Sequence, residues 1–159
     1  MSRRRFMVLV TNLSGAGITL LIAVPIVGSV LSPIFQRRSH PWIRLGDIAE
    51  VPLAQPTAYV VQFPVTQAWK VPAVPRIVYV VKLNLNGQTQ VLSLSNVCTH
   101  MECDVHWDTS LNEFVCPCHG GFYALDGANI GGPPPKPLYR YEHRLDGTTL
   151  YVRDVLTEA

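Results

Sequence analysis

The sequence reads Cys98-Thr99-His100-Met101-Glu102-Cys103 at one point and Cys116-Pro117-Cys118-His119-Gly120-Gly121-Phe122-Tyr123 a short distance later. These two motifs contain all four cysteines of the chain and two of its five histidines. Because the cysteines are confined to this region, they indicate a local site and not a disulfide framework for the whole chain. A thiolate and an imidazole from each of two loops would form a Cys₂His₂ set of metal ligands.

The distribution of these ligands separates an iron–sulfur cluster from its alternatives. A zinc finger pairs its cysteines on one side and its histidines on the other, whereas each motif here contributes one of each. Two mirrored half-sites suit a two-iron cluster with thiolates on one iron and imidazoles on the other. The motifs therefore predict a [2Fe–2S] cluster, with a zinc site and a pair of simple disulfides as the alternatives.

The pair Cys-Thr-His-x-x-Cys and Cys-Pro-Cys-His-Gly resembles the Rieske iron–sulfur subunit of bacterial quinol–cytochrome c oxidoreductases, the cytochrome bc complexes. The resemblance extends to residues 131–135, Gly-Gly-Pro-Pro-Pro, which are similar to the proline loop that covers the cluster in that family. It implies an all-β Rieske domain, built from antiparallel sheets with a cluster-binding subdomain.

The resemblance also implies roles for the motif residues. Cys98 and Cys116 would bind the inner iron. His100 and His119 would bind the outer iron and contact the quinol. The remaining cysteines, Cys103 and Cys118, would form a disulfide that ties the two loops together. Such a bridge persists outside the cytoplasm, so the head is expected on the extracytoplasmic side of the membrane.

A second group of residues is expected around the cluster: Met101, Gly121, Tyr123, Pro133 and Pro134. Met101 stands for a usual Leu as an apolar cover, and the neighbouring Glu102 replaces a usual Gly. Gly121 stands where many relatives have a Ser that donates to a cluster sulfur, while Tyr123 keeps the second hydroxyl. A missing donor lowers the reduction potential, which favours menaquinol as the electron donor. Exchange of Gly121 for Ser is accordingly expected to raise that potential.

The N-terminal part of the chain has no charged residue between Phe6 and Phe35, and arginines flank it on both sides. A membrane span needs about 20 predominantly apolar residues. We therefore expect residues 1–35 to form one transmembrane anchor in the bacterial cytoplasmic membrane. A cleaved signal peptide is the alternative, but its apolar region is shorter, about 7–15 residues.

The rest of the chain divides into a polar tether or hinge over residues 36–46 and a head domain over residues 47–159. Runs rich in Val and Tyr, or alternating in polarity, predict strands. An Asn86-Gly87 pair predicts a tight hairpin. No helix of normal length is expected after residue 36. The expected strands are 58–63, 77–85, 90–95, 122–125, 139–145 and 148–153.

The resemblance implies an electron-transfer subunit of an enzyme complex that couples quinol oxidation to proton translocation. It would accept one electron from quinol and pass it to a c-type cytochrome, beside a cytochrome b subunit in a dimeric complex. The alternatives are the small subunit of a periplasmic molybdenum oxidase such as arsenite oxidase, and a ferredoxin that serves an oxygenase. A net charge of only +2, with scattered basic residues, gives no indication of nucleic-acid binding.

Overall fold

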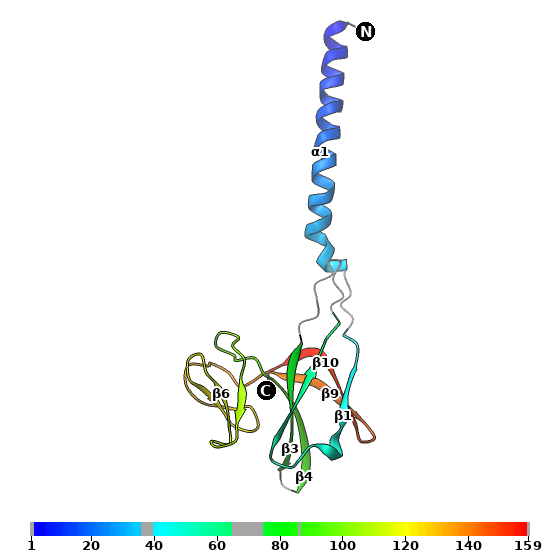
Figure 1. Cartoon of the computed structure of the whole chain (residues 1–159). Coiled ribbons are helices and arrows are strands. Elements are labelled where there is room, and N and C mark those ends of the chain that lie inside the picture. Colours follow the sequence, from blue (N-terminus) through cyan, green and yellow to red (C-terminus); the bar gives the residue numbers. More distant parts are fainter. Residues whose placement is uncertain (1, 36–39, 65–74, 86, 159) are drawn as a thin grey trace. The chain divides into compact units, whose positions relative to one another are not determined.

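The computed structural model describes residues 2–35, 40–64, 75–85 and 87–158 (Figure 1). The chain separates into two compact units, Met1–Ser39 and His40–Ala159. Residues 36–39, which belong to the predicted tether, and Asn86 of the predicted hairpin turn lie outside the described residues.

The first unit contains the helix α1, Arg3–Phe35, which is 33 residues long. At 1.5 Å per residue it measures about 50 Å, more than the roughly 30 Å of a hydrocarbon core. The segment Arg3–Ser32 has a mean hydropathy of 2.0 and could cross a membrane. Hydroxyl side chains bond within the helix, as where Thr11 donates to the carbonyl of Met7 over 2.9 Å. The helix therefore fits the expected membrane anchor.

The second unit is built on a six-stranded antiparallel sheet in the order β1-β10-β9-β4-β3-β2. A single turn of 3₁₀ helix, Ile48–Glu50, is the only helical segment among its described residues, as the sequence predicts. The strands are β1 (Ile43–Asp47), β2 (Pro56–Val61), β3 (Arg76–Leu85), β4 (Gln88–Ser95), β9 (Arg140–Asp146) and β10 (Thr149–Thr157).

Strand β1 corrects the expected tether. The sequence predicts a tether that runs to residue 46, but Ile43–Asp47 pairs with β10 in the sheet. Ile43 and Leu45 pack against the hydrophobic core, which explains why this polar-looking stretch is ordered as a strand. Just before them, the Trp42 ring lies 4.7 Å from the Arg144 guanidinium carbon, a cation–π contact. Any linker therefore ends before Trp42.

A smaller four-stranded antiparallel sheet forms the expected cluster-binding subdomain. Its strands are β5 (His106–Asp108), β6 (Glu113–Cys116), β7 (Gly121–Tyr123) and β8 (Asn129–Gly131), in sequence order. The strand predicted over 122–125 is shorter and begins one residue earlier, because Gly121 pairs with Cys116 at the end of the β6–β7 hairpin. The all-β fold class predicted from the sequence is confirmed.

Strand β3 separates two hydrophobic cores and so fixes the small sheet against the large one. Its side chains alternate, as in any strand. Tyr79 and Val81 belong to the core shared with Phe114 of β6. Val78 and Val80 belong to the opposite core. The Tyr79 and Phe114 rings are 5.0 Å apart, so aromatic packing joins the two sheets directly beneath the second cysteine motif.

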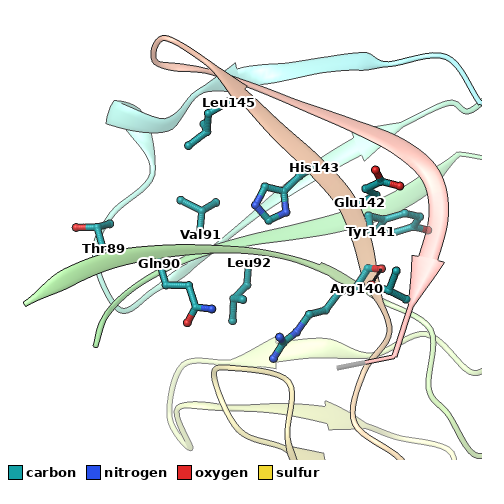
Figure 2. Close-up of a pocket in the computed structure, with 10 residues that line it drawn as sticks. Thr89, Gln90, Val91, Leu92, Arg140, Tyr141, Glu142, His143 and Leu145 are labelled. Carbon is teal, nitrogen blue, oxygen red and sulfur yellow. Dashed lines mark hydrogen bonds between the residues drawn. The ribbon is translucent and has the colours of Figure 1, made fainter. Parts of the chain in front are cut away.

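A cavity of about 550 Å³ opens where β4 and β9, which pair at Leu94 and Arg140, diverge. Figure 2 shows His143 of β9 and Val91 of β4 on its walls. Burial lowers the pKa of His143 below the ordinary value of an imidazole. None of the residues that line the cavity belongs to the cysteine motifs.

Candidate metal centre

The first cysteine motif forms a loop between β4 and β5 that is closed by its own backbone. The amide of Cys98 donates to the carbonyl of Cys103 over 2.9 Å, and the amide of Glu102 donates to the carbonyl of Cys98 over 3.0 Å. The amide of Val105 donates to the carbonyl of Asn96 over 2.7 Å, which closes the base of the loop. These bonds hold Cys98 and His100 in one short, compact turn.

Glu102 has a backbone φ of +58°, in the left-handed region. A residue with a side chain adopts this region at a cost of about 1–2 kcal/mol, whereas glycine does so freely. This is a physical reason for the glycine that the family resemblance implies at this point of the motif. Glu102 adopts this conformation despite its side chain. The side chain lines a surface cavity of about 410 Å³, which His100 also lines.

The second cysteine motif forms the turn between β6 and β7. Cys116 and Gly121 are the last paired residues of the hairpin. The amide of Gly120 donates to the carbonyl of Cys116 over 3.2 Å, and Gly120 reaches its φ of +67° without strain. Between them, Cys118 and His119 are presented on the exposed tip of the turn.

A disulfide between Cys103 and Cys118 joins the two loops, with 6.5 Å between the Cα atoms. The sulfur of Cys116 lies within 4.8 Å of both bridged sulfurs. The bridged cysteines carry no thiolate, so this group of three sulfurs cannot act as a metal site. The predicted disulfide is therefore present, and it leaves Cys98 and Cys116 as the free thiols.

The four remaining donors lie at two levels of exposure. Cys98 and Cys116 are buried, each with 2% of its surface exposed. His100 and His119 are exposed, and their ring centroids are 5.0 Å apart at an interplanar angle of 83°. Two buried thiols and two exposed imidazoles match the sulfur-bound and nitrogen-bound irons of a two-iron cluster. The donor set therefore fits the predicted [2Fe–2S] group.

The surroundings of Cys98 favour the thiolate form that binds metal. Burial raises the pKa of this thiol. Hydrogen bonds from the Tyr123 hydroxyl and from the His100 backbone amide outweigh that effect, so the pKa falls below its ordinary value. Burial and the adjacent Cys98 sulfur raise the pKa of Cys116. Without a bound cation, deprotonation of Cys98 alone is therefore more favourable than deprotonation of both Cys98 and Cys116.

The Tyr123 hydroxyl is the centre of a hydrogen-bond network behind the first loop. Its oxygen lies 3.3 Å from the Cys98 sulfur and accepts the Thr99 backbone amide over 3.1 Å. The Thr99 hydroxyl lies 3.2 Å from Tyr123 and donates to the Lys136 carbonyl over 2.7 Å. Burial raises the pKa of Tyr123 to about 12, so its proton stays available for donation to the Cys98 sulfur.

The structure places the other predicted residues around these loops as follows. Pro134 is buried against Gly121, while Pro133 and Met101 are exposed. The shielding role of Met101 stays a prediction. Sequence reasoning missed Thr99 and Lys136. Thr99 could have been proposed because it lies inside the first motif. Lys136 could not, because it accepts the hydrogen bond through its backbone carbonyl, which every residue type has.

The fold and the donor set define a small iron–sulfur domain with a disulfide between its two ligand loops. Residues 42–142 match the family described as the Rieske [2Fe-2S] domain. The chain belongs to the Rieske family, and its cofactor is a Rieske-type [2Fe–2S] cluster.

The similarity to individual relatives covers almost the whole chain, including helix α1. The chain is 30% identical over 156 residues to the menaquinol:cytochrome c reductase iron-sulfur subunit of Geobacillus thermodenitrificans, covering 95% of this chain and 90% of that protein. It is 29% identical to the cytochrome b6-f complex iron-sulfur subunit of Chlorobaculum thiosulfatiphilum, covering 94% and 74%. Among solved structures, the plasma membrane Rieske protein PetC3 from Synechocystis PCC 6803 is 25% identical, with a TM-score of 0.47, covering 69% and 97%.

Exchange of Tyr123 for Phe is expected to lower the reduction potential of the cluster while leaving the cluster in place. A Cys98 sulfur bound to the cluster carries no proton, so the Tyr123 hydroxyl 3.3 Å away would be the donor and would stabilise the reduced, more negative state. Phenylalanine fills the same buried space without this donor. We expect a fall on the order of 60 mV, which is a tenfold change for a one-electron couple. An EPR-monitored redox titration measures it. Tyr151→Phe, on β10, is the control, and equal midpoints for the two variants would contradict the donation.

Proposed function

We propose that this chain is the Rieske subunit of a menaquinol-oxidising cytochrome bc complex. The observation that carries the proposal is the pair of exposed imidazoles, 5.0 Å apart, on loops whose thiols are buried. The proposed ligands are Cys98, Cys116, His100 and His119. The relative from Geobacillus thermodenitrificans, named a menaquinol:cytochrome c reductase subunit, supports the choice of quinol.

The imidazoles give the proposed reaction its coupling of proton and electron. The bound cluster supplies a centre that takes up and releases one electron. An imidazole that ligates a metal through one nitrogen keeps a second ring nitrogen. On the exposed loops, that nitrogen of His100 or His119 can accept a hydrogen bond from the quinol hydroxyl and hold its proton. The thiols of Cys98 and Cys116 are buried, so the exposed imidazoles are the ligands that a quinol can reach.

The proposal assigns positions and partners to the two units. Helix α1 would anchor the subunit in the cytoplasmic membrane, and the disulfide favours a head on the extracytoplasmic side, where bridges persist. The partners would be a cytochrome b subunit, a c-type cytochrome, menaquinol and the lipid bilayer, in a dimeric complex. The chain before Trp42 would act as the hinge between anchor and head. The named relatives favour this complex over the molybdenum oxidase alternative.

Purification of the full chain from native membranes in mild detergent tests the proposal. We expect a b-type haem spectrum to copurify, and we expect anaerobic menaquinol to reduce the cluster, seen as the appearance of its EPR signal. His106→Gln, at an exposed histidine outside the motifs, is the control and should behave as wild type. A preparation without haem b, or a cluster that arsenite reduces and menaquinol does not, would refute the proposal.

A further inference from the structure

The ring of Pro134 occupies the space that a side chain at position 121 would need. A Cβ atom built on Gly121 would lie 2.6 Å from Cγ and 3.1 Å from Cδ of Pro134. Real Cβ contacts are not that short, so one of the two residues would have to move. Pro134 is buried, whereas Pro133 and Pro135 on either side of it are exposed. Pro134 is therefore the proline of residues 131–135 that faces the second ligand loop, the turn between β6 and β7.

The segment of residues 131–135 also packs closely on the ligand loop at a second point, Gly132. A Cβ on Gly132 would meet the carbonyl oxygen of Gly120 and would lie 2.9 Å from the Cα of Gly121. The backbone of the segment thus packs directly on the backbone of the ligand loop, without a side chain between them. A proline ring is also rigid and cannot rotate aside as a long side chain can.

A side chain at position 121 would point at the cluster ligands. Gly121 lies opposite Cys116 in the β6–β7 hairpin, and its Cβ would stand 3.4 Å from the Cβ of Cys116. Residues two apart in a strand share a face, so position 121 faces the same way as Tyr123. The hydroxyl of Tyr123 already contacts the sulfur of Cys98 on that face. A hydroxyl at 121 would be the corresponding donor beside Cys116.

We propose that Pro134 is a positioning residue that sets the reduction potential of the cluster by excluding a hydroxyl side chain at position 121. The ring closes the space, the second donor is lost, and the reduced cluster is stabilised less. Position 134, which lies outside both ligand motifs, would in this way decide which quinols the subunit can oxidise. This proposal rests on the proposed function, in which a [2Fe–2S] cluster is bound, and adds a residue that sets the reduction potential of that cluster.

Gly121→Ser alone should therefore not simply raise the reduction potential, as the sequence by itself predicts. In the presence of Pro134 the serine has no space, so the substitution should disturb the ligand loop instead of simply adding a donor. The increase in potential should require Pro134→Ala as well, because alanine removes the Cγ and Cδ atoms that make the close contacts.

A double-mutant cycle on the full chain in detergent tests the coupling. The variants are Gly121→Ser and Gly121→Ala, each alone and each combined with Pro134→Ala, beside Pro134→Ala itself. Thermal loss of the cluster's visible absorption reports the clash, and a redox titration followed by EPR reports the donor. We expect either substitution at 121 to lower the melting temperature by several degrees when Pro134 is present, and by much less in the Pro134→Ala background.

The matched pair for the hydroxyl is Gly121→Ser/Pro134→Ala against Gly121→Ala/Pro134→Ala. These differ by one oxygen atom, and we expect the serine variant to have the higher midpoint. Equal destabilisation by Gly121→Ala in the two backgrounds, or a serine midpoint no higher than that of alanine, would overturn the inference. Neither measurement uses quinol or a partner subunit, so a failed test of the proposed function would leave this result unaffected.

Discussion

Exchange of His119 for alanine is expected to remove the cluster completely. Each iron needs its full set of protein contacts, and the exposed imidazole of His119 is one of the two nitrogen donors. His119 lies at the tip of the β6–β7 turn, outside both hydrophobic cores. The sheets should therefore still fold. We expect no bound iron and no Rieske EPR signal, with the circular dichroism of the β-sheets retained.

Alanine substitution of each of the three other proposed ligands should cause the same loss of iron, but the effects on the stability of the fold should differ. His100→Ala removes the second exposed imidazole and should spare the fold. Cys98→Ala and Cys116→Ala remove buried thiols that belong to the core shared with β3, so some loss of stability accompanies the loss of iron. His106→Ala, at an exposed position outside the motifs, is the control that should keep the cluster. A normal EPR signal in any of the four ligand variants would exclude that residue as a ligand.

The disulfide, which the structure contains, was implied by the resemblance of the two motifs to the Rieske family, and the four cluster ligands proposed on the same basis stay a prediction. Each motif holds its thiol and imidazole within a single turn, so their spacing alone fixes that they share a loop. The Tyr123 network and the contact between Pro134 and Gly121 could not be predicted in this way. Thr99 and Lys136 are bonded across a separation of 37 residues, and only the packing of the small sheet brings them together.

The strands differ in the same way: some can be predicted from a local sequence pattern, and others form only through pairing with distant residues. Long strands such as β3 and β4 have enough residues to reveal their period, and they were expected nearly where they lie. The strands β5 and β8 have three residues each, too few for any periodicity. The strand β1 was expected in a tether, because its Arg44 and Gly46 weaken the pattern and its pairing partner lies more than a hundred residues later.

Loss of the Cys103–Cys118 disulfide is expected to destabilise the head without removing any proposed ligand. The bridge closes a loop with a sequence separation of 15 residues. A loop of this size corresponds to about 3 kcal/mol in the chain-entropy account, and removal of a native bridge from a small domain costs roughly 2–5 kcal/mol. Denaturant unfolding of Cys103→Ser, followed by circular dichroism, should show this decrease in the free energy of unfolding.

The double variant Cys103→Ser/Cys118→Ser separates the bridge from its individual cysteines. If the covalent link carries the effect, the double variant should be about as unstable as either single variant, since a link can be lost only once. The cluster should assemble in all three and be lost faster on dilution, because the loops are then joined by contacts such as that of Tyr123 with Thr99. Additive losses from the two single substitutions would assign the stability to the packing of each side chain instead. Thiol labelling of both cysteines in the unreduced native protein would exclude the bridge itself.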